Sequence, residues 1–229
     1  MNNFENFKFR ASSVGNLMSK PKKKSETLAE TTKHFLREVY IGKVYKRDYD
    51  LNNKFLEKGN YCEEDSLSLV TSNRKKLYLK NKDQFENEFV KGTPDIIEKD
   101  NVIDIKTCWD IRTFVHKTEV ISMYYWQLQS YMWLTGKDHA ELIFTLVNAP
   151  EHLIVAEKNK RMWQLGISTE SPEWAKEEGR IEKLMLYDDI DPTLRMKVFK
   201  TERSQEDIER LIGQIEVARE FLGAITLNG

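Results

Sequence analysis

Cysteine is scarce in this sequence, and its histidines are scattered. Cys62 and Cys108 are the two cysteines among 229 residues, too few for a disulfide framework or for the four ligands of a cysteine-bound iron–sulfur cluster. We expect both to pack as small apolar side chains. The histidines lack the spacing of zinc ligands and lie at His34, His116, His139 and His152. Neither zinc nor iron–sulfur chemistry is therefore expected to underlie the function.

Two further absences concern net charge and long apolar runs. The 36 basic and 37 acidic side chains nearly cancel, giving a formal net charge of −1, so no global positive field attracts nucleic acid or an anionic membrane. No apolar run approaches the roughly 20 residues that span a bilayer, and the first residues lack the pattern of a secretory signal. Hydrophobic residues make up 40% of the chain, so we expect a soluble, cytoplasmic globular protein. If such a chain binds nucleic acid, the positive charge that it uses must be local.

The expected elements alternate between helices and strands. The spacing of apolar residues predicts helices over 28–44, 53–77, 117–135, 172–187 and 204–221, and strands over 88–97, 102–107, 140–148, 152–156 and 194–200. A further short helix is expected near Ser12 and Ser13, where a serine can cap it. This order predicts a single α/β domain over residues 1–229, with a central mixed β-sheet flanked by helices. Within it, residues 19–27 are interpreted as a mobile basic loop and residues 150–191 as an insertion.

The chemically informative residues flank a predicted turn, with Asp95 before it and with Asp104 and Lys106 after it. Adjacent antiparallel strands can bring Asp95 beside Asp104. The two-residue spacing places Asp104 and Lys106 on one face of their strand, and Ile105 then faces the core. Two close carboxylates repel each other unless a cation lies between them, and oxygen ligands of this kind suit Mg²⁺ or Mn²⁺. With a lysine to neutralise phosphate charge, the pattern is typical of phosphodiester hydrolysis.

Such a short pattern also has a structural alternative, because the same residues fit an ordinary ion pair on a strand and short motifs occur by chance. Two features outside the pattern favour the functional interpretation. Glu63 lies on a predicted helix that could pack beside the sheet, and helix phase alone separates it from its rival Glu64. Gln127 lies in an otherwise apolar helix. Gln129 is rotated by about 200° from Gln127, so the two are not expected to reach one site.

Four blocks, taken in order, carry a resemblance to a known family. They are Arg10-Ala11-Ser12-Ser13-Val14 with the Ser19-Lys20-Pro21 loop, Gly59 to Asp65, Thr93-Pro94-Asp95 with Asp104-Ile105-Lys106, and Tyr124 to Trp133. The terminal helix from Ser204 also matches. The sequence thus resembles the lambda-type phage exonucleases, the viral recombinase branch of the PD-(D/E)XK nuclease superfamily. The resemblance spans most of the chain outside residues 150–191 and implies a restriction-endonuclease-like core.

The resemblance implies a set of catalytic residues, namely Glu63, Asp95, Asp104, Lys106 and Gln127. Asp95 and Asp104 would bind a metal ion, together with the Ile105 carbonyl, and Glu63 would bind a second ion directly or through water. Lys106 would orient or activate the water nucleophile, and the glutamine matches the family's active-site glutamine. Asp104 replaces a more usual glutamate, which the superfamily tolerates. Mg²⁺ is the implied cofactor, with Mn²⁺ as a substitute.

The resemblance also implies DNA contacts, at Arg10, Ser12, Thr93, Tyr124 and Tyr131. The hydroxyl groups of Ser12 and Thr93 match those that contact a 5′-phosphate in the family. The family's arginine upstream of them has no counterpart, because Glu5 occupies that position, and Arg10 is the substitute that we consider. Core packing is the alternative role of the two tyrosines. Residues 20–24 and 74–76 are the basic patches best suited to further phosphate contacts.

The function implied by the resemblance is that of an Mg²⁺-dependent exonuclease that digests double-stranded DNA from an end, 5′ to 3′. It further implies a ring-shaped homotrimer and a single-strand annealing protein as a partner in phage recombination. A ring would retain DNA by topology, which suits a chain of nearly zero net charge. Two alternatives stay open. One is a structure- or site-specific endonuclease on the same scaffold, and the other is a non-catalytic module that binds DNA or protein.

Overall fold

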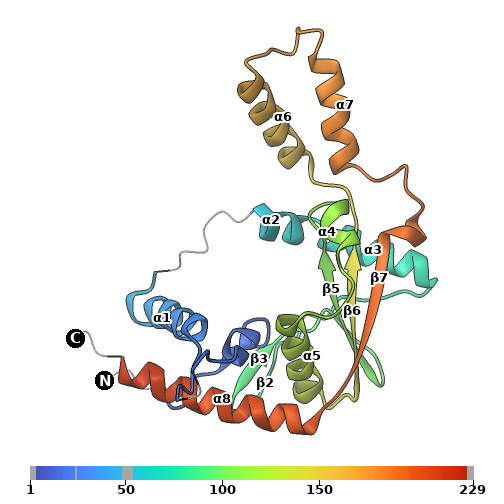
Figure 1. Cartoon of the computed structure of the whole chain (residues 1–229). Coiled ribbons are helices and arrows are strands. Elements are labelled where there is room, and N and C mark those ends of the chain that lie inside the picture. Colours follow the sequence, from blue (N-terminus) through green and yellow to red (C-terminus); the bar gives the residue numbers. More distant parts are fainter. Residues whose placement is uncertain (1–3, 24, 48–53, 226–229) are drawn as a thin grey trace.

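The computed structural model describes residues 4–23, 25–47 and 54–225 (Figure 1). The helices are α1 (Glu30–Tyr45), α2 (Lys54–Tyr61), α3 (Glu63–Arg74), α4 (Ile111–Val115), α5 (Ser122–Thr135), α6 (Glu151–Leu165), α7 (Trp174–Met185) and α8 (Gln205–Ala224), with 3₁₀ helices η1 (Val14–Met18) and η2 (Pro192–Arg195). The strands are β1 (Phe9–Arg10), β2 (Phe85–Glu86), β3 (Val90–Gly92), β4 (Ile96–Ile97), β5 (Asn101–Thr107), β6 (His139–Thr145) and β7 (Met196–Glu202). The expected α/β class is confirmed.

A mixed four-stranded sheet, in the order β4-β5-β6-β7, forms the centre of the fold. β5 and β6 are parallel, whereas β4 and β7 run antiparallel to their neighbours. Helices cover both faces of the sheet. On one face Ile103 of β5 packs with Val70 of α3, and on the other Leu142 of β6 packs with Leu128 of α5. Because side chains alternate along a strand, Asp104 faces α5. The expected mixed sheet flanked by helices is therefore confirmed.

A smaller sheet, in the order β1-β3-β2, contacts α5 beside the central sheet. A Cβ atom on Gly92 of β3 would lie 2.7 Å from Tyr131 and 2.8 Å from Ala11, so glycine is needed for the close approach of the strand to the helix. The expectation of one strand over 88–97 is wrong, since β3 and β4 belong to different sheets. Pro94 lies between them and has no N–H to donate to a ladder.

Residues 151–185 form a helical hairpin, α6 and α7, that projects from the sheet (Figure 1). The strand expected over 152–156 is therefore wrong, and the first turns of α6 take its place. A short apolar run fits a strand or a buried helix equally well. Here Leu153 packs into a small core with Trp174 and Ile181 of α7, which is what decides in favour of the helix. The helix expected over 172–187 is confirmed as α7.

The helix expected over 53–77 is two helices, α2 and α3, that meet at Cys62. Its first residue, Asn53, lies outside the described residues. Cys62 has φ −97° and ψ 15°, which departs from helical geometry, and Gly59 lowers the helix propensity of the preceding turn. Glu63 consequently begins α3 instead of lying within a longer helix. Cys62 and Cys108 are both buried and free, as expected for small apolar side chains.

The sequence predicts some ends of the remaining helices correctly and others incorrectly. Ser204 caps α8, because its hydroxyl accepts a hydrogen bond from the Asp207 N–H at 3.2 Å. No such cap forms near Ser12, where the Ser13 hydroxyl donates to the Arg10 carbonyl instead and the helix that follows is 3₁₀. The helices expected at 28–44 and 117–135 are confirmed as α1 and α5, with later starts. None of the described helices combines the length and the apolar character of a membrane span.

Candidate active site

Asp95 and Asp104 lie side by side on neighbouring strands. β4 pairs antiparallel with β5, and the pairing of Ile96 with Ile103 places the preceding Asp95 opposite Asp104. The Oδ2 atom of Asp95 accepts a hydrogen bond from the Ile105 N–H at 2.7 Å. The predicted convergence of the two aspartates is thus present, and one backbone N–H holds it in place.

Asp104 is nearly inaccessible to solvent, with a relative exposure of 2%. Its Oδ1 atom accepts a hydrogen bond from Gln127 Nε2 at 3.1 Å, and the same amide lies 2.9 Å from the hydroxyl of Tyr131. Its Oδ2 atom accepts no hydrogen bond of normal angle among the described residues and lies 2.9 Å from Lys106 Nζ. A buried carboxylate with one oxygen free of hydrogen bonds retains capacity for a cation.

Lys106 shares its strand face with Asp104, as the sequence predicts. Its ammonium also lies 5.6 Å above the ring of Tyr124, a geometry that favours a cation. Burial alone would lower the pKa of Lys106, but the negative charge of Asp104 outweighs burial and raises the pKa above its ordinary value. Lys106 is therefore protonated at neutral pH and can act as a fixed positive charge.

Asp95 has an unusual protonation equilibrium. Burial, and after it the charge of the neighbouring Asp104, raise its pKa to about 7, although the Ile105 N–H and Lys106 act to lower the pKa. The physical cause is that a second carboxylate charge in a buried position is costly without an additional positive charge. Perturbed carboxyl groups of this kind gather at functional sites.

Glu63, the first residue of α3, faces the region of Asp95 and Lys106. It lines a cavity of about 410 Å³ whose wall also includes Asp95, Ile105 and Lys106; we call it the acidic cavity. Asp104 lies just behind this wall, against Lys106. Glu64, the rival residue, is exposed and does not line the cavity. Helix phase therefore places Glu63, and not Glu64, on the wall of this cavity.

Among the described residues, no group of three or more His, Cys, Asp or Glu side chains is close enough to hold a metal ion. Glu63, on the wall of the same cavity, forms an ion pair with Lys80. The oxygen donors that could hold an ion are therefore the Asp95 and Asp104 carboxylates and a backbone carbonyl such as that of Ile105. This donor chemistry fits a hard cation such as Mg²⁺.

The residues expected to contact DNA lie at a second cavity of about 970 Å³, which we call the N-terminal cavity. Its wall includes four of the five expected residues, namely Arg10, Ser12, Thr93 and Tyr131. Tyr131 is mostly buried and reaches both this wall and Gln127. Tyr124, the fifth residue, lines the acidic cavity instead. Because Thr93 and Asp95 are two residues apart, the two cavities adjoin one backbone segment.

None of Gln129, the basic residues 74–76, Trp163 and Trp174 lines either cavity. Gln129 faces away from the acids, donates to the Glu202 carbonyl and accepts from the Ser204 N–H, as its helical position predicts. Two of the three basic side chains at 74–76 already form ion pairs within the chain: Arg74 binds Glu141 at 2.6 Å, and Lys76 binds Glu98. Trp174 is buried within the hairpin, whereas Trp163 is 84% exposed.

Sequence reasoning missed Lys80, which lines the acidic cavity and pairs with Glu63. Lys80 lies in an irregular segment between α3 and β2. No periodicity or motif marks it, because its place depends on how this segment folds back over the sheet. Its place between two of the motif blocks was the one weak signal.

Comparisons with known proteins bear on the fold. No protein-family model and no curated protein matches the chain. The phage-related exonuclease of Haemophilus somnus 129PT superposes with a TM-score of 0.76 at 26% identity, over 97% of this chain and 96% of that one. An alkaline exonuclease from Laribacter hongkongensis gives 0.64 at 13% identity, over 96% and 90%, and its complex with dAMP gives 0.62 at 14%, over 95% and 88%. The resemblance to the lambda-type exonucleases and the restriction-endonuclease-like core are confirmed.

The raised pKa of Asp95 predicts a pH-dependent stability in metal-free buffer. A carboxyl group whose pKa is higher in the folded chain stabilises the fold at low pH, and this contribution is lost as the pH rises through about 7. Asp95→Asn removes the titration. Its free energy of unfolding relative to wild type should therefore rise between about pH 4 and pH 8, by roughly 1–4 kcal/mol, as measured by urea unfolding with a chelator present.

Asp100→Asn, at an exposed turn between β4 and β5, is the matched control and should follow wild type across this range. A constant difference between Asp95→Asn and wild type at every pH would contradict the electrostatic account of the aspartate pair.

Proposed function

We propose that this chain is an Mg²⁺-dependent deoxyribonuclease that digests double-stranded DNA from an end, 5′ to 3′. One observation carries the proposal: a buried Asp104 carboxylate lies between Gln127 and Lys106, with Asp95 beside it. Buried acids beside a protonated lysine, at the wall of a cavity, are suited to phosphodiester hydrolysis. The structural similarity to two exonucleases supports the same activity.

The chain's own residues divide the chemistry among them. Asp95, Asp104 and the Ile105 carbonyl would hold the metal, which when bound supplies Lewis-acid stabilisation of phosphate charge. Lys106 is protonated, so we assign to it the neutralisation of phosphate charge and the orientation of the attacking water, not the removal of a proton. Gln127 fixes the Asp104 carboxylate through its amide. Glu63 would bind a second ion, directly or through water.

The two cavities suggest how a DNA end would be placed. The N-terminal cavity presents a guanidinium at Arg10 and hydroxyl groups at Ser12 and Thr93, a set that suits a terminal phosphate. Thr93 leads directly into Pro94 and Asp95. A terminal 5′-phosphate in the first cavity would therefore lie close to the acids of the second, which favours an exonuclease over the alternative of an endonuclease.

A ring-shaped homotrimer is the assembly that we propose. Since the net charge is −1, encirclement would retain DNA where a global positive field is lacking. In phage recombination, a single-strand annealing protein would then take up the strand that digestion leaves behind.

Light scattering on the purified chain should report the mass of three chains, with and without DNA, and a monomer in both samples would rule the ring out.

Catalysis and binding should separate in two variants. Asp95→Asn removes one negative ligand, and Lys106→Ala removes the fixed ammonium. Each should slow digestion of a linear duplex by at least roughly a hundredfold, while binding in a chelator-containing buffer stays within about threefold of wild type. Gel assays with and without Mg²⁺ or Mn²⁺ give the rates, and fluorescence anisotropy gives the affinities.

Lys117→Ala changes another lysine of the acidic cavity wall and serves as the control, with a loss of activity below about tenfold. If wild-type protein leaves DNA intact with either metal, the chain is a binding module. Full activity of Asp95→Asn would place the chemistry elsewhere.

End dependence distinguishes the exonuclease from the endonuclease. Linear duplexes with 5′-phosphate or 5′-hydroxyl ends are compared with a closed circle. We expect the phosphorylated duplex to be digested fastest, its 3′-ended strand to remain, and the circle to stay intact. Arg10→Ala should reduce the preference for the phosphate, because it removes a charged contact from the N-terminal cavity. Linearisation of the circle would instead support the endonuclease.

A further inference from the structure

Lys80 lies in the acidic cavity and has no place in the roles described above. Its ammonium pairs with Glu63 Oε2, and Lys80 lines the same cavity as Asp95 and Lys106. The segment that carries it, between α3 and β2, belongs to none of the motif blocks of the sequence. The position of a lysine here therefore has to be explained from the structure.

The backbone on both sides of Lys80 is fixed. Tyr78 is 7% exposed and packs in the core formed with Val70 and Ile103. On the other side, the Asn81 N–H donates to the Asp95 carbonyl at 2.7 Å, and the Asn81 side chain donates to the Pro94 carbonyl at 3.0 Å. Lys80 is thus held next to the backbone that carries Asp95. Because the backbone on both sides is held, the Lys80 side chain starts from a fixed point on the cavity wall.

Lys80 and Lys106, two of the three lysines that line the cavity, differ in the exposure of their acidic partners. Lys106 pairs with Asp104, whose side chain is 2% exposed, whereas Lys80 pairs with Glu63, whose side chain is 46% exposed. An ion pair between exposed groups contributes little to stability, because water and salt screen it. Lys80 can therefore exchange Glu63 for an external anion at small cost.

We propose that Lys80 binds a phosphate of the DNA strand at the mouth of the acidic cavity, beside the phosphodiester that Asp95 and Lys106 face. The proposal rests on the nuclease function proposed above and adds a substrate-binding residue to it. Lys80 is the more exposed of the two lysines, at 37% against 28% for Lys106. It would therefore meet the backbone of the strand outside the reacting bond.

A competing explanation is that Lys80 only neutralises and orients Glu63. The two explanations differ in a double-mutant cycle. If Lys80 acts through Glu63 alone, Lys80→Ala has no further effect once Glu63→Gln has removed the charge of its partner. If Lys80 binds phosphate, Lys80→Ala weakens DNA binding in both backgrounds.

The experiment measures binding of a short fluorescent duplex by the full chain, by anisotropy in a chelator-containing buffer at several salt concentrations. Lys80→Ala should weaken binding roughly tenfold and lower the slope of log affinity against log salt by about 1, the value for one lost phosphate contact. Lys80→Arg should restore both. The same losses should appear in the Glu63→Gln background.

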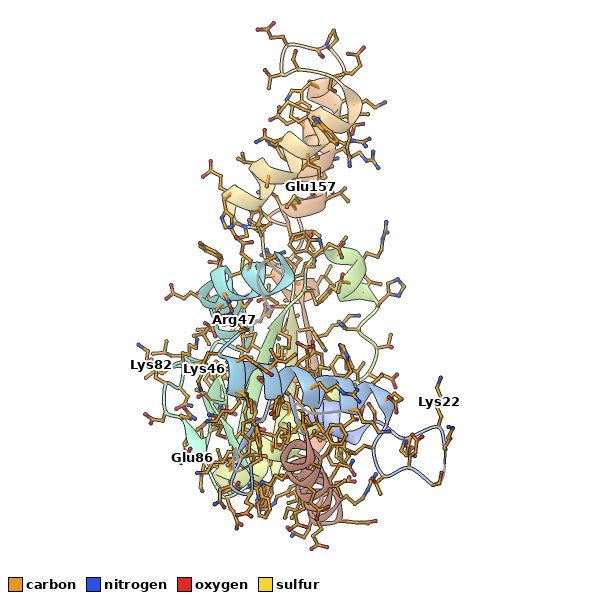
Figure 2. The ribbon with its side chains drawn as sticks, turned by 90° about the vertical axis from the view of Figure 1, so that its left-hand side faces the viewer. Lys22, Lys46, Arg47, Lys82, Glu86 and Glu157 are labelled. Carbon is orange, nitrogen blue, oxygen red and sulfur yellow. The ribbon has the colours of Figure 1, made fainter. Side chains whose placement is uncertain are left out.

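Lys82→Ala is the matched control, since Lys82 lies two residues away in the same segment, at the outer edge of the molecule in Figure 2, and does not line the cavity. It should change the salt slope by much less than Lys80→Ala. Thermal unfolding of each variant separates a loss of binding from a loss of fold, and Lys80→Gln, which also removes the ammonium, takes the place of Lys80→Ala if that protein is unstable.

An unchanged salt slope in Lys80→Ala overturns the proposal, and so does an effect that vanishes in the Glu63→Gln background. If wild-type protein neither binds nor digests the duplex, the nuclease function falls and this role falls with it. If wild type binds and digests DNA while Lys80→Ala matches it, the role of Lys80 alone is refuted.

Discussion

The buried carboxylate of Asp104 is the constraint on which the candidate site depends. A charge with 2% exposure is costly unless partners compensate it, and the partners come from two elements. Gln127 reaches it from α5, and Lys106 reaches it from two residues further along β5. The contact between Gln127 and Asp104 joins α5 to the sheet. The position of the Asp104 carboxylate in the site therefore depends on how α5 packs on β5.

The remaining features of the site follow from that charge. Asp95 lies opposite Asp104 because β4 and β5 are antiparallel neighbours, and its raised pKa expresses the burial and the repulsion between the two. The negative charge of Asp104 also raises the pKa of Lys106 and so keeps this lysine protonated. Further out, Glu63 and Lys80 form a second pair of opposite charges that is open to solvent. The buried pair of Asp104 and Lys106 is suited to holding a fixed positive charge. The exposed pair of Glu63 and Lys80 is suited to exchanging one partner for a group of the substrate.

Local patterns in the sequence predicted most of the fold and the inner part of the site. Alternation along β5 placed Asp104 and Lys106 on one face, and helical spacing separated Gln127 from Gln129; both depend on geometry within a single element. The failures are of another kind. The strand at 152–156 was wrong because only packing against Trp174 distinguishes it from a helix, and the strand at 88–97 was divided because its halves joined different sheets. Lys80 was missed because its position depends on hydrogen bonds from Asn81 to Pro94 and Asp95, which are distant in the sequence.

Diffraction from crystals soaked with Mn²⁺ tests the central claim most directly, because anomalous scattering locates the ion independently of activity. The account predicts a peak in contact with the carboxylates of Asp95 and Asp104, with Gln127 still donating to Asp104. A Mn²⁺ ion bound elsewhere, or an Asp104 carboxylate that turns away from Asp95 when the ion binds, would contradict it.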